Sequence, residues 1–386
     1  MSWIKISAIN ILVLFGLVAI LELAWFFYQN NFHDNEQCQL DWVAYNYCPN
    51  LKKTQFNLLE DGGDVIEIQV DTIGGRIRPG SESALGTAHR FMIGDSFIQA
   101  DEMAYENTLY GKWNEMIEGS TYALGYASWN PIQYFDAIKK IGRANSHYYV
   151  FLMTNDVNPK YFRSVYGELY TEKKPLFDSM RKLFFYRALR FIVRHIPVSV
   201  AHEMSEKSYT SMIETNTFSQ IHIDDCGVLS EFKDGVYSEK MYFDYLVFSK
   251  SNDCWPELHK KAFDDFVVIN NKIQNYVLNE LSSEITFVWV GAGWAHLKQN
   301  SLGRLSYGFP SNIAITQQGL INEFRNRFPS SSVVNIEQLI NDDLSVCIEG
   351  CTDKYFYAQD GHWTPYTHSL IFEKLSSLSQ LSNKYE

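Results

Sequence analysis

Apolar runs alternate along this chain with segments of helical periodicity. The runs at 148–153 and 285–290 are typical of strands buried on both faces of a parallel sheet, whereas 65–70 alternates in polarity like a strand with one solvated face. Helical periodicity marks the ranges 101–118, 131–141, 263–281 and 317–328. This alternation of strand and helix predicts an α/β fold.

A long apolar segment stands near the start of the chain. Residues 6–27 are apolar except for Ser7, Asn10 and Glu22, and about 20 such residues cross a bilayer as a helix. We therefore expect residues 1–33 to be a membrane anchor. Lys5 precedes the span and acidic residues follow it, which predicts a cytoplasmic N-terminus and an extracytoplasmic main domain. A cleaved signal peptide is the alternative, but its apolar core would be shorter.

The chain after the anchor divides into a lead-in segment, residues 34–69, and one main domain, residues 70–386. The alternation of strand and helix is lost at about 161–254, which we interpret as an insertion. A basic and aromatic stretch at 177–195 predicts a helix that packs its apolar side on the domain. Contact of that helix with anionic lipid headgroups beside the anchor is the alternative.

The charge balance excludes one class of partner. Acidic residues outnumber basic ones by 45 to 33, so that the formal net charge is −12. A chain of this charge lacks the electrostatic footprint of a nucleic-acid-binding protein. Its 46% hydrophobic and 20% charged residues are the proportions of a folded globular protein.

The six cysteines fall into pairs that are close in sequence: Cys38 with Cys48, Cys226 with Cys254, and Cys347 with Cys351. An oxidising compartment would join such pairs, in agreement with an extracytoplasmic domain. Spacing alone leaves the connectivity open, and buried free thiols are the alternative. No Cys-x-x-Cys motif or Cys/His cluster indicates a zinc site.

The segment Phe91–Phe97 carries the first candidate for chemistry. Its apolar residues lead into Gly-Asp-Ser and then into a helical pattern. A serine at such a strand-to-helix turn is exposed at the carboxyl edge of a parallel sheet, so Ser96 is a candidate nucleophile. Because adjacent side chains diverge, we expect Asp95 to support this turn rather than to act as the acid of a triad.

A base for this serine is available near the C-terminus, in the sequence Asp-Gly-His-Trp at 360–363. His362 would take the serine proton, and Asp360 would orient the imidazole and stabilise its charged form. Candidate donors for an oxyanion hole follow two other strands. The backbone N–H of Gly125 and the side-chain amide of Asn155 would join the N–H of Ser96.

In order and spacing, Ser96 in Gly-Asp-Ser, Gly125, Asn155 in Thr-Asn-Asp, and His362 resemble the Ser, Gly, Asn and His blocks of the SGNH/GDSL hydrolase superfamily. The resemblance spans about residues 70–380. It implies a flavodoxin-like three-layer α/β/α sandwich with a parallel sheet, and acyl transfer through a serine ester intermediate. It also implies that no metal or organic cofactor takes part.

The histidine block indicates a subtype. Asp-x-His-Trp is similar to the periplasmic alginate O-acetyltransferase-like branch, whereas many members place the acid three residues before the histidine, where this chain has Gln359. A glycine that often follows the histidine is replaced within Pro365–His368. Upstream of the nucleophile, Gly74-Gly75-Arg76 loosely resembles a glycine-arginine element of some bacterial members, and we assign no catalytic role to Arg76.

The sequence thus predicts a membrane-anchored serine esterase, in the periplasm or another extracytoplasmic space, that acts on O-acyl esters of a carbohydrate, chiefly O-acetyl esters. The carbohydrate rests on the subtype and the location, and on 15% aromatic residues that offer stacking surfaces for sugars. A polysaccharide O-acetyltransferase with the same triad is the first alternative. A non-catalytic anchored protein for glycan binding or assembly is the second, and a lipase-like role at the membrane, suggested by the helix at 177–195, is the third.

Overall fold

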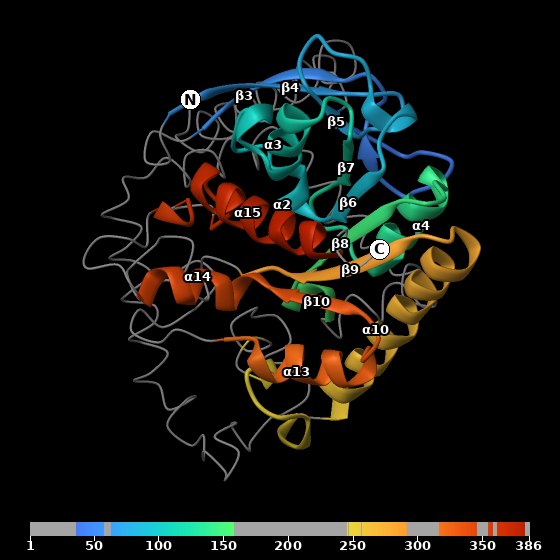
Figure 1. Cartoon of the computed structure of the whole chain (residues 1–386), viewed down its shortest axis with the longest axis vertical. Coiled ribbons are helices and arrows are strands. Elements are labelled where there is room, and N and C mark those ends of the chain that lie inside the picture. Colours follow the sequence, from blue (N-terminus) through green and yellow to red (C-terminus); the bar gives the residue numbers. More distant parts are fainter. Residues whose placement is uncertain are drawn as a thin grey trace, which may run out of the picture. The chain divides into compact units, whose positions relative to one another are not determined.

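A mixed β-sheet of eight strands organises the part of the chain that the structure describes (Figure 1). The computed structural model describes residues 36–57, 63–157, 245, 247–255, 257–291, 316–345, 354–357 and 361–382. The strands of the sheet are β3 (Lys52–Phe56), β4 (Val65–Val70), β5 (Arg76–Ile77), β6 (Arg90–Gly94), β7 (Thr121–Gly125), β8 (His147–Leu152), β9 (Glu284–Trp289) and β10 (Ser332–Asn335). Their spatial order is β10-β9-β8-β6-β7-β5-β4-β3. Two shorter strands, β1 (Gln37–Cys38) and β2 (Asn46–Tyr47), form a separate antiparallel pair.

The strands β7, β6, β8, β9 and β10 are parallel neighbours. Parallel neighbours require crossover connections, and the helices between these strands in the chain supply them. Strand β8 is buried from Tyr148 to Leu152, and β9 is buried from Ile285 to Trp289. The continuous apolar runs therefore predicted the fully buried strands of this half correctly.

The other half of the sheet is antiparallel, which corrects the prediction of a wholly parallel sheet. Strand β5 pairs antiparallel with β7, β4 with β5, and β3 with β4. The connections that join these three strands, 57–64 and 71–75, are too short for a crossover, so the chain can only turn back on itself. The segment 34–69, predicted as a lead-in, thus supplies β3 and most of β4 to the main sheet.

Helices flank both faces of the sheet (Figure 1). One face packs against α4 (Pro131–Ile141), α10 (Glu257–Asn275) with the π-helical turn Tyr276–Glu280, and α13 (Gln318–Arg327). The other packs against α2 (Ser96–Gln99), α3 (Leu109–Met116), α14 (Ile336–Ser345) and α15 (Pro365–Ser382). Successive strand residues enter opposite cores, with Phe91 and Ile93 on the first face and Met92 on the second. Short 3-10 turns lie at Ala84–Gly86, Tyr105–Asn107, Thr154–Val157 and Asn252–Cys254.

The predicted helices agree with the structure to different degrees. The range 131–141 is confirmed as α4, whose start is set by an Asn130 capping box with proline in the first turn. The range 101–118 shortens to α3, because Thr108 caps a helix that begins at Leu109. Strand β10 and the helices α14 and α15 were not anticipated from the hydrophobic pattern.

Three of the six cysteines lie within the described residues, and all three are disulfide-bonded. The predicted pair of Cys38 and Cys48 is confirmed, with an S–S distance of 1.99 Å. Cys254 is also disulfide-bonded. Cys226, Cys347 and Cys351 lie outside the described residues.

The predicted anchor at 6–27 and the predicted helix at 177–195 also lie outside the described residues. Within the described ranges, no helix is both long enough and apolar enough to cross a membrane. From Gln37 onwards, the described residues belong to one compact unit.

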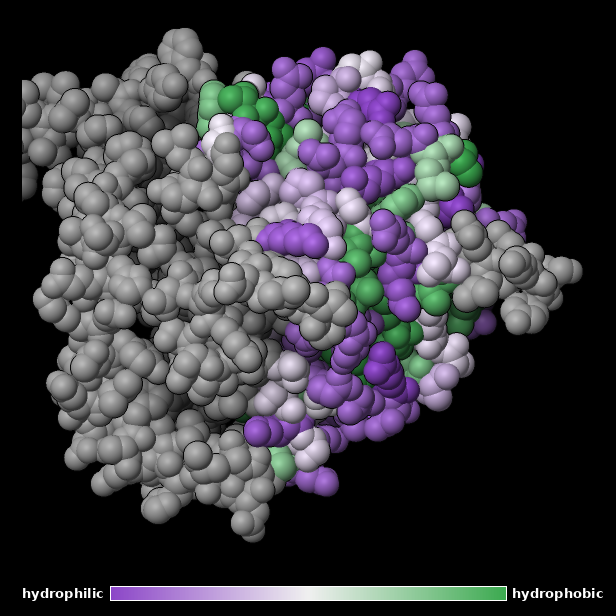
Figure 2. Space-filling view, turned by 60° about the vertical axis from the view of Figure 1, so that its left-hand side comes forward, coloured by the Kyte–Doolittle hydropathy of each residue, from purple (hydrophilic) through white to green (hydrophobic). Residues whose placement is uncertain are grey.

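The coloured surface in Figure 2 is mainly hydrophilic, with hydrophobic residues gathered in small groups. Phe56, at 72%, and Val65, at 62%, are among the most exposed large hydrophobic side chains of the described residues. These two residues face each other in the register of β3 and β4, at the edge of the sheet.

Candidate active site

The turn between β6 and α2 presents Ser96 at the carboxyl end of a parallel strand. Asp95 caps the helix, since its Oδ1 accepts a hydrogen bond of 3.1 Å from the backbone N–H of Phe97. The carboxylate therefore supports the turn, as expected from the sequence. Strands β7 and β8 lie on the two sides of β6, so the turn projects where the strand order reverses, which is where open α/β sheets bind ligands.

Gly125 ends β7 directly opposite Gly94 in the register of β6 and β7. A Cβ atom at Gly125 would lie 2.9 Å from the carbonyl oxygen of Asp95 and 2.9 Å from the Cβ of Ile98. A side chain here would push the nucleophile turn out of place, so the close approach itself requires glycine.

Asn155 follows β8, in the 3-10 turn Thr154–Val157, and its side chain donates a hydrogen bond to Asp95. The structure therefore brings Ser96, Gly125 and Asn155 to the ends of three adjacent strands. These are the positions that the sequence predicted for the donors of an oxyanion hole.

His362 lies beside the candidate nucleophile, although 266 positions separate them in the chain. Its Nε2 is 2.8 Å from Oγ of Ser96, which is hydrogen-bond distance. When Nε2 carries no proton, the serine hydroxyl donates to it. The pair then has the geometry of a nucleophile next to its general base.

Aromatic packing and backbone pairing hold His362 in place. Its ring centroid lies 4.7 Å from that of Phe97, which also contacts Trp363 at 4.9 Å. The Trp363 indole donates a 3.0 Å hydrogen bond to the Gly291 carbonyl and is 1% exposed. Trp363 also forms an antiparallel bridge with Phe356. The tryptophan after the histidine is thus an anchor for the loop that presents the base.

A carboxylate that the sequence did not single out lies near the other ring nitrogen. Oε1 of Glu102 is 3.6 Å from Nδ1 of His362, and both side chains are 15% exposed. The predicted acid, Asp360, lies outside the described residues. Glu102 is one of 45 acidic residues, and nothing in its local pattern separates it from the others.

Two buried carboxyl groups lie beneath the nucleophile turn. Burial raises the pKa of Asp95, while hydrogen bonds from Phe97 and Asn155 and the charge of His362 oppose that rise. Burial, together with the charge of Asp95, holds the pKa of Asp156 well above its ordinary value. Asp95 thus has more groups that stabilise its charged form, and the pKa of Asp156 is raised further than that of Asp95.

Asp156→Asn is expected to change how stability depends on pH. Because the pKa of Asp156 is raised in the folded state, its contribution to stability is complete below the unfolded pKa of 3.8 and is lost as the pH rises through the folded pKa. An amide does not titrate, and its oxygen still accepts from the Met153 N–H or the Tyr134 hydroxyl, as the carboxylate does. Relative to wild type, the variant should gain about 1.4 kcal/mol per pH unit across this window.

Chemical denaturation of the full-length chain at pH 4 and at pH 7 measures this effect. Asp264→Asn, at a carboxylate that is 60% exposed and paired with Arg327, is the matched control. A free energy of unfolding that, relative to wild type, stays constant or falls in Asp156→Asn as the pH rises would contradict the assignment.

Arg76 is buried and holds the chain that leaves α2. Its guanidinium donates to the carbonyl of Gln99 at 3.2 Å, to that of Met103 at 2.5 Å, and also to that of Ala100. Ala100 has the left-handed conformation, with φ of 49°, which turns the chain after the helix. Arg76 is therefore a structural support for the segment that follows the nucleophile.

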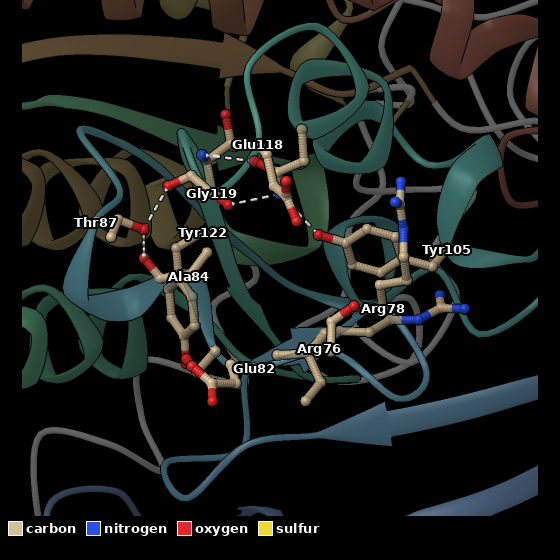
Figure 3. Close-up of a pocket in the computed structure, with 14 residues that line it drawn as sticks. Arg76, Arg78, Glu82, Ala84, Thr87, Tyr105, Glu118, Gly119 and Tyr122 are labelled. Atoms are coloured by element: carbon tan, nitrogen blue, oxygen red, sulfur yellow. Dashed lines mark hydrogen bonds between the residues drawn. The ribbon is translucent and has the colours of Figure 1, made fainter.

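Arg76 also lines a cavity of about 410 Å³. Arg76, Arg78 and Tyr105 line one side of it, and Thr87 and Tyr122 line the other (Figure 3). Thr121 and Tyr122, at the amino end of β7, line the cavity, whereas Gly125 lies at the carboxyl end of that strand. The cavity is thus separate from the Ser96 and His362 pair.

Within the described residues, no group of three or more His, Cys, Asp or Glu side chains is arranged to hold a metal ion. Neither a scan against protein-family models nor a search of curated proteins found a match for this chain.

Proposed function

We propose that this chain is a serine esterase of the SGNH/GDSL type that acts on O-acyl esters of a carbohydrate, chiefly O-acetyl esters. The observation that carries the proposal is the distance of 2.8 Å between Ser96 Oγ and His362 Nε2. The positions of Gly125 and Asn155 on the flanking strands support it, because acyl transfer needs hydrogen-bond donors beside the nucleophile.

The arrangement of the sheet also supports the proposal. Numbered along the chain, the five parallel strands have the order 2-1-3-4-5, which is the order of flavodoxin-like folds. With helices on both faces, we infer a flavodoxin-like three-layer sandwich that carries an antiparallel extension at one edge. Ser96 follows the first strand of this order, next to the switch point.

In the proposed reaction, Oγ of Ser96 attacks the acyl carbonyl carbon while Nε2 of His362 takes the hydroxyl proton. The negative charge that develops on the carbonyl oxygen is met by the N–H groups of Ser96 and Gly125 and by the amide of Asn155. When the ester bond breaks, His362 returns its proton to the departing sugar oxygen, which leaves the acyl group on Ser96. Asp360 would orient the imidazole and stabilise its charged form.

The second half of the reaction decides between hydrolysis and transfer. His362 removes a proton from water, or from a sugar hydroxyl, and that oxygen attacks the acyl-serine. The bond from the acyl carbon to Oγ then breaks, and His362 returns the proton to Ser96, which releases a free acid or an acylated sugar. A polysaccharide O-acetyltransferase therefore uses the same residues and is the alternative function. The Asp-Gly-His-Trp block supports this alternative, because the block is similar to that of the alginate O-acetyltransferase-like branch.

We place the catalytic domain outside the cytoplasm, in the periplasm or a comparable space, anchored through residues 6–27. The apolar span in the sequence supports the anchor, and the disulfide between Cys38 and Cys48 supports an oxidising compartment.

A fluorophosphonate, which phosphonylates activated serines, tests the proposal. Intact-mass analysis of the full-length chain should show one adduct, and peptide mapping should place it on Ser96. Ser96→Ala should remove the adduct, whereas Ser81→Ala, at an exposed loop serine, should keep it. An absence of adduct on folded, disulfide-bonded protein would contradict the esterase and favour the non-catalytic glycan-binding or assembly protein.

A further inference from the structure

We propose that Glu102 is a positioning residue of this site: its carboxylate orients the His362 imidazole and stabilises the charge that the ring acquires. The inference rests on the proposed function, because it assigns a partner to the proposed general base. Glu102 follows the nucleophile helix, and it is proposed in addition to Asp360, the acid that the sequence suggests in the loop before His362.

The geometry places the groups on opposite sides of one ring. Nε2 of His362 faces Oγ of Ser96 at 2.8 Å, and Nδ1 faces Oε1 of Glu102 at 3.6 Å. The second distance is that of an ion pair rather than of a direct hydrogen bond, and such contacts tighten when substrate binds. Both side chains are 15% exposed, so solvent screens their interaction less than it screens a surface pair.

The backbone of Glu102 is tied to the loop that carries His362. Its carbonyl accepts a hydrogen bond of 3.1 Å from the Tyr357 hydroxyl and one of 2.5 Å from the Asn57 side chain. The backbone N–H of Tyr357 donates in turn to the carbonyl of His362 at 2.9 Å. One tyrosine thus connects the two loops and sets the distance between the carboxylate and the imidazole.

Glu102 also belongs to the segment that leaves the nucleophile helix. Arg76 binds the carbonyls on both sides of it, at Ala100 and at Met103. The serine and this carboxylate are therefore held by one supported stretch of chain. Glu102 thus adds a charged neighbour beside Nδ1 when the ring lies against Ser96.

Other titratable groups also act on this imidazole. Asp95 is a buried carboxyl group near the ring, and the charge of His362 lowers its pKa. His368, on α15, is buried, and burial lowers its pKa to about 3, so it is neutral at physiological pH. Among these groups of the described residues, Glu102 is the carboxylate within ion-pair distance of Nδ1.

The test compares Glu102→Gln with Glu102→Asp and with the control Glu106→Gln. Glu106 lies four positions further along the same segment, where it pairs with Arg78 at 3.4 Å. The first measurement is the pH dependence of the fluorophosphonate reaction rate at Ser96. The second is the titration midpoint of the His362 Cε1–H signal in NMR spectra, assigned by its loss in His362→Ala. Both use the full-length chain.

We expect Glu102→Gln to lower the plateau rate by about tenfold to a hundredfold. The acid limb of the pH–rate profile and the titration midpoint of His362 should both move to lower pH by about one unit. A nearby negative charge favours the protonated ring, and the variant removes that charge. Glu102→Asp should restore part of both effects, and Glu106→Gln should behave as wild type. A purely structural role would not move the midpoint.

Glu102→Gln that matches wild type in both the rate and the midpoint would overturn the inference. The NMR measurement needs no reaction at Ser96. If wild type reacts with no fluorophosphonate, the proposed function fails, while the midpoint still decides whether Glu102 acts on His362.

Discussion

His362→Ala should lower the rate of acylation at Ser96 by about 10⁴-fold or more, with little change in the fold. The serine hydroxyl is 2.8 Å from Nε2, and without this base it must lose its proton to water in the transition state. A loss of 10⁴ corresponds to about 5.5 kcal/mol of transition-state stabilisation. The His362 side chain is 15% exposed and its loop keeps the Trp363 anchor, so the structural cost should be small.

The measurement is the second-order rate constant for fluorophosphonate labelling, together with hydrolysis of p-nitrophenyl acetate. His89→Ala is the matched control, since His89 is exposed and lies just before β6, at the end of that strand away from Ser96. Retention of more than a tenth of the wild-type rate in His362→Ala would argue that a different group activates Ser96, or that no group does.

Arg76→Met should have the largest effect on stability, a loss of about 3–5 kcal/mol in the free energy of unfolding. The methionine keeps much of the length but none of the donors, so the carbonyls of Gln99, Ala100 and Met103 lose their partner. Asp101 also loses a nearby positive charge, although Lys53 remains 3.0 Å from its carboxylate. Because the segment that Arg76 binds follows α2 directly, labelling at Ser96 should slow as well.

Denaturant titration of the two purified proteins measures the difference. Arg78→Met removes the same group two positions further on, where the side chain is 39% exposed and pairs with Glu106. That control should lose less than about 1 kcal/mol, as is usual for an exposed ion pair. Equal losses in the two variants would show that the buried hydrogen bonds of Arg76 stabilise the fold no more than the exposed ion pair of Arg78 does.

Local patterns predicted the elements whose environment is uniform along their length. The run at 148–153 identified a strand covered on both faces, and the helical periodicity at 131–141 identified α4. The antiparallel edge was missed because β3 and β5 are short, and their pairing depends on connection length rather than on periodicity. Residues 101–107 were predicted as helix, but Thr108 caps a helix that begins only at Leu109.

The candidate site shows the same division. The Gly-Asp-Ser block identified the turn at Ser96, because a strand that ends in a tight turn and a helix is written in neighbouring residues. His362 was proposed from its neighbours in the sequence, but its contact with Ser96 depends on the order of the strands and on the path of the chain between the two residues. Glu102 had no local signal at all.

By itself, then, the sequence determined the strand and helix alternation and the nucleophile turn, and it identified Ser96 and His362 as candidate catalytic residues. Only the tertiary structure decided that Ser96 and His362 meet, that Glu102 faces the remaining ring nitrogen, and that Arg76 supports the chain between them. The physical reason is that periodicity and capping act over one or two turns of chain, whereas these contacts join residues brought together by the packing of the sheet and its helices.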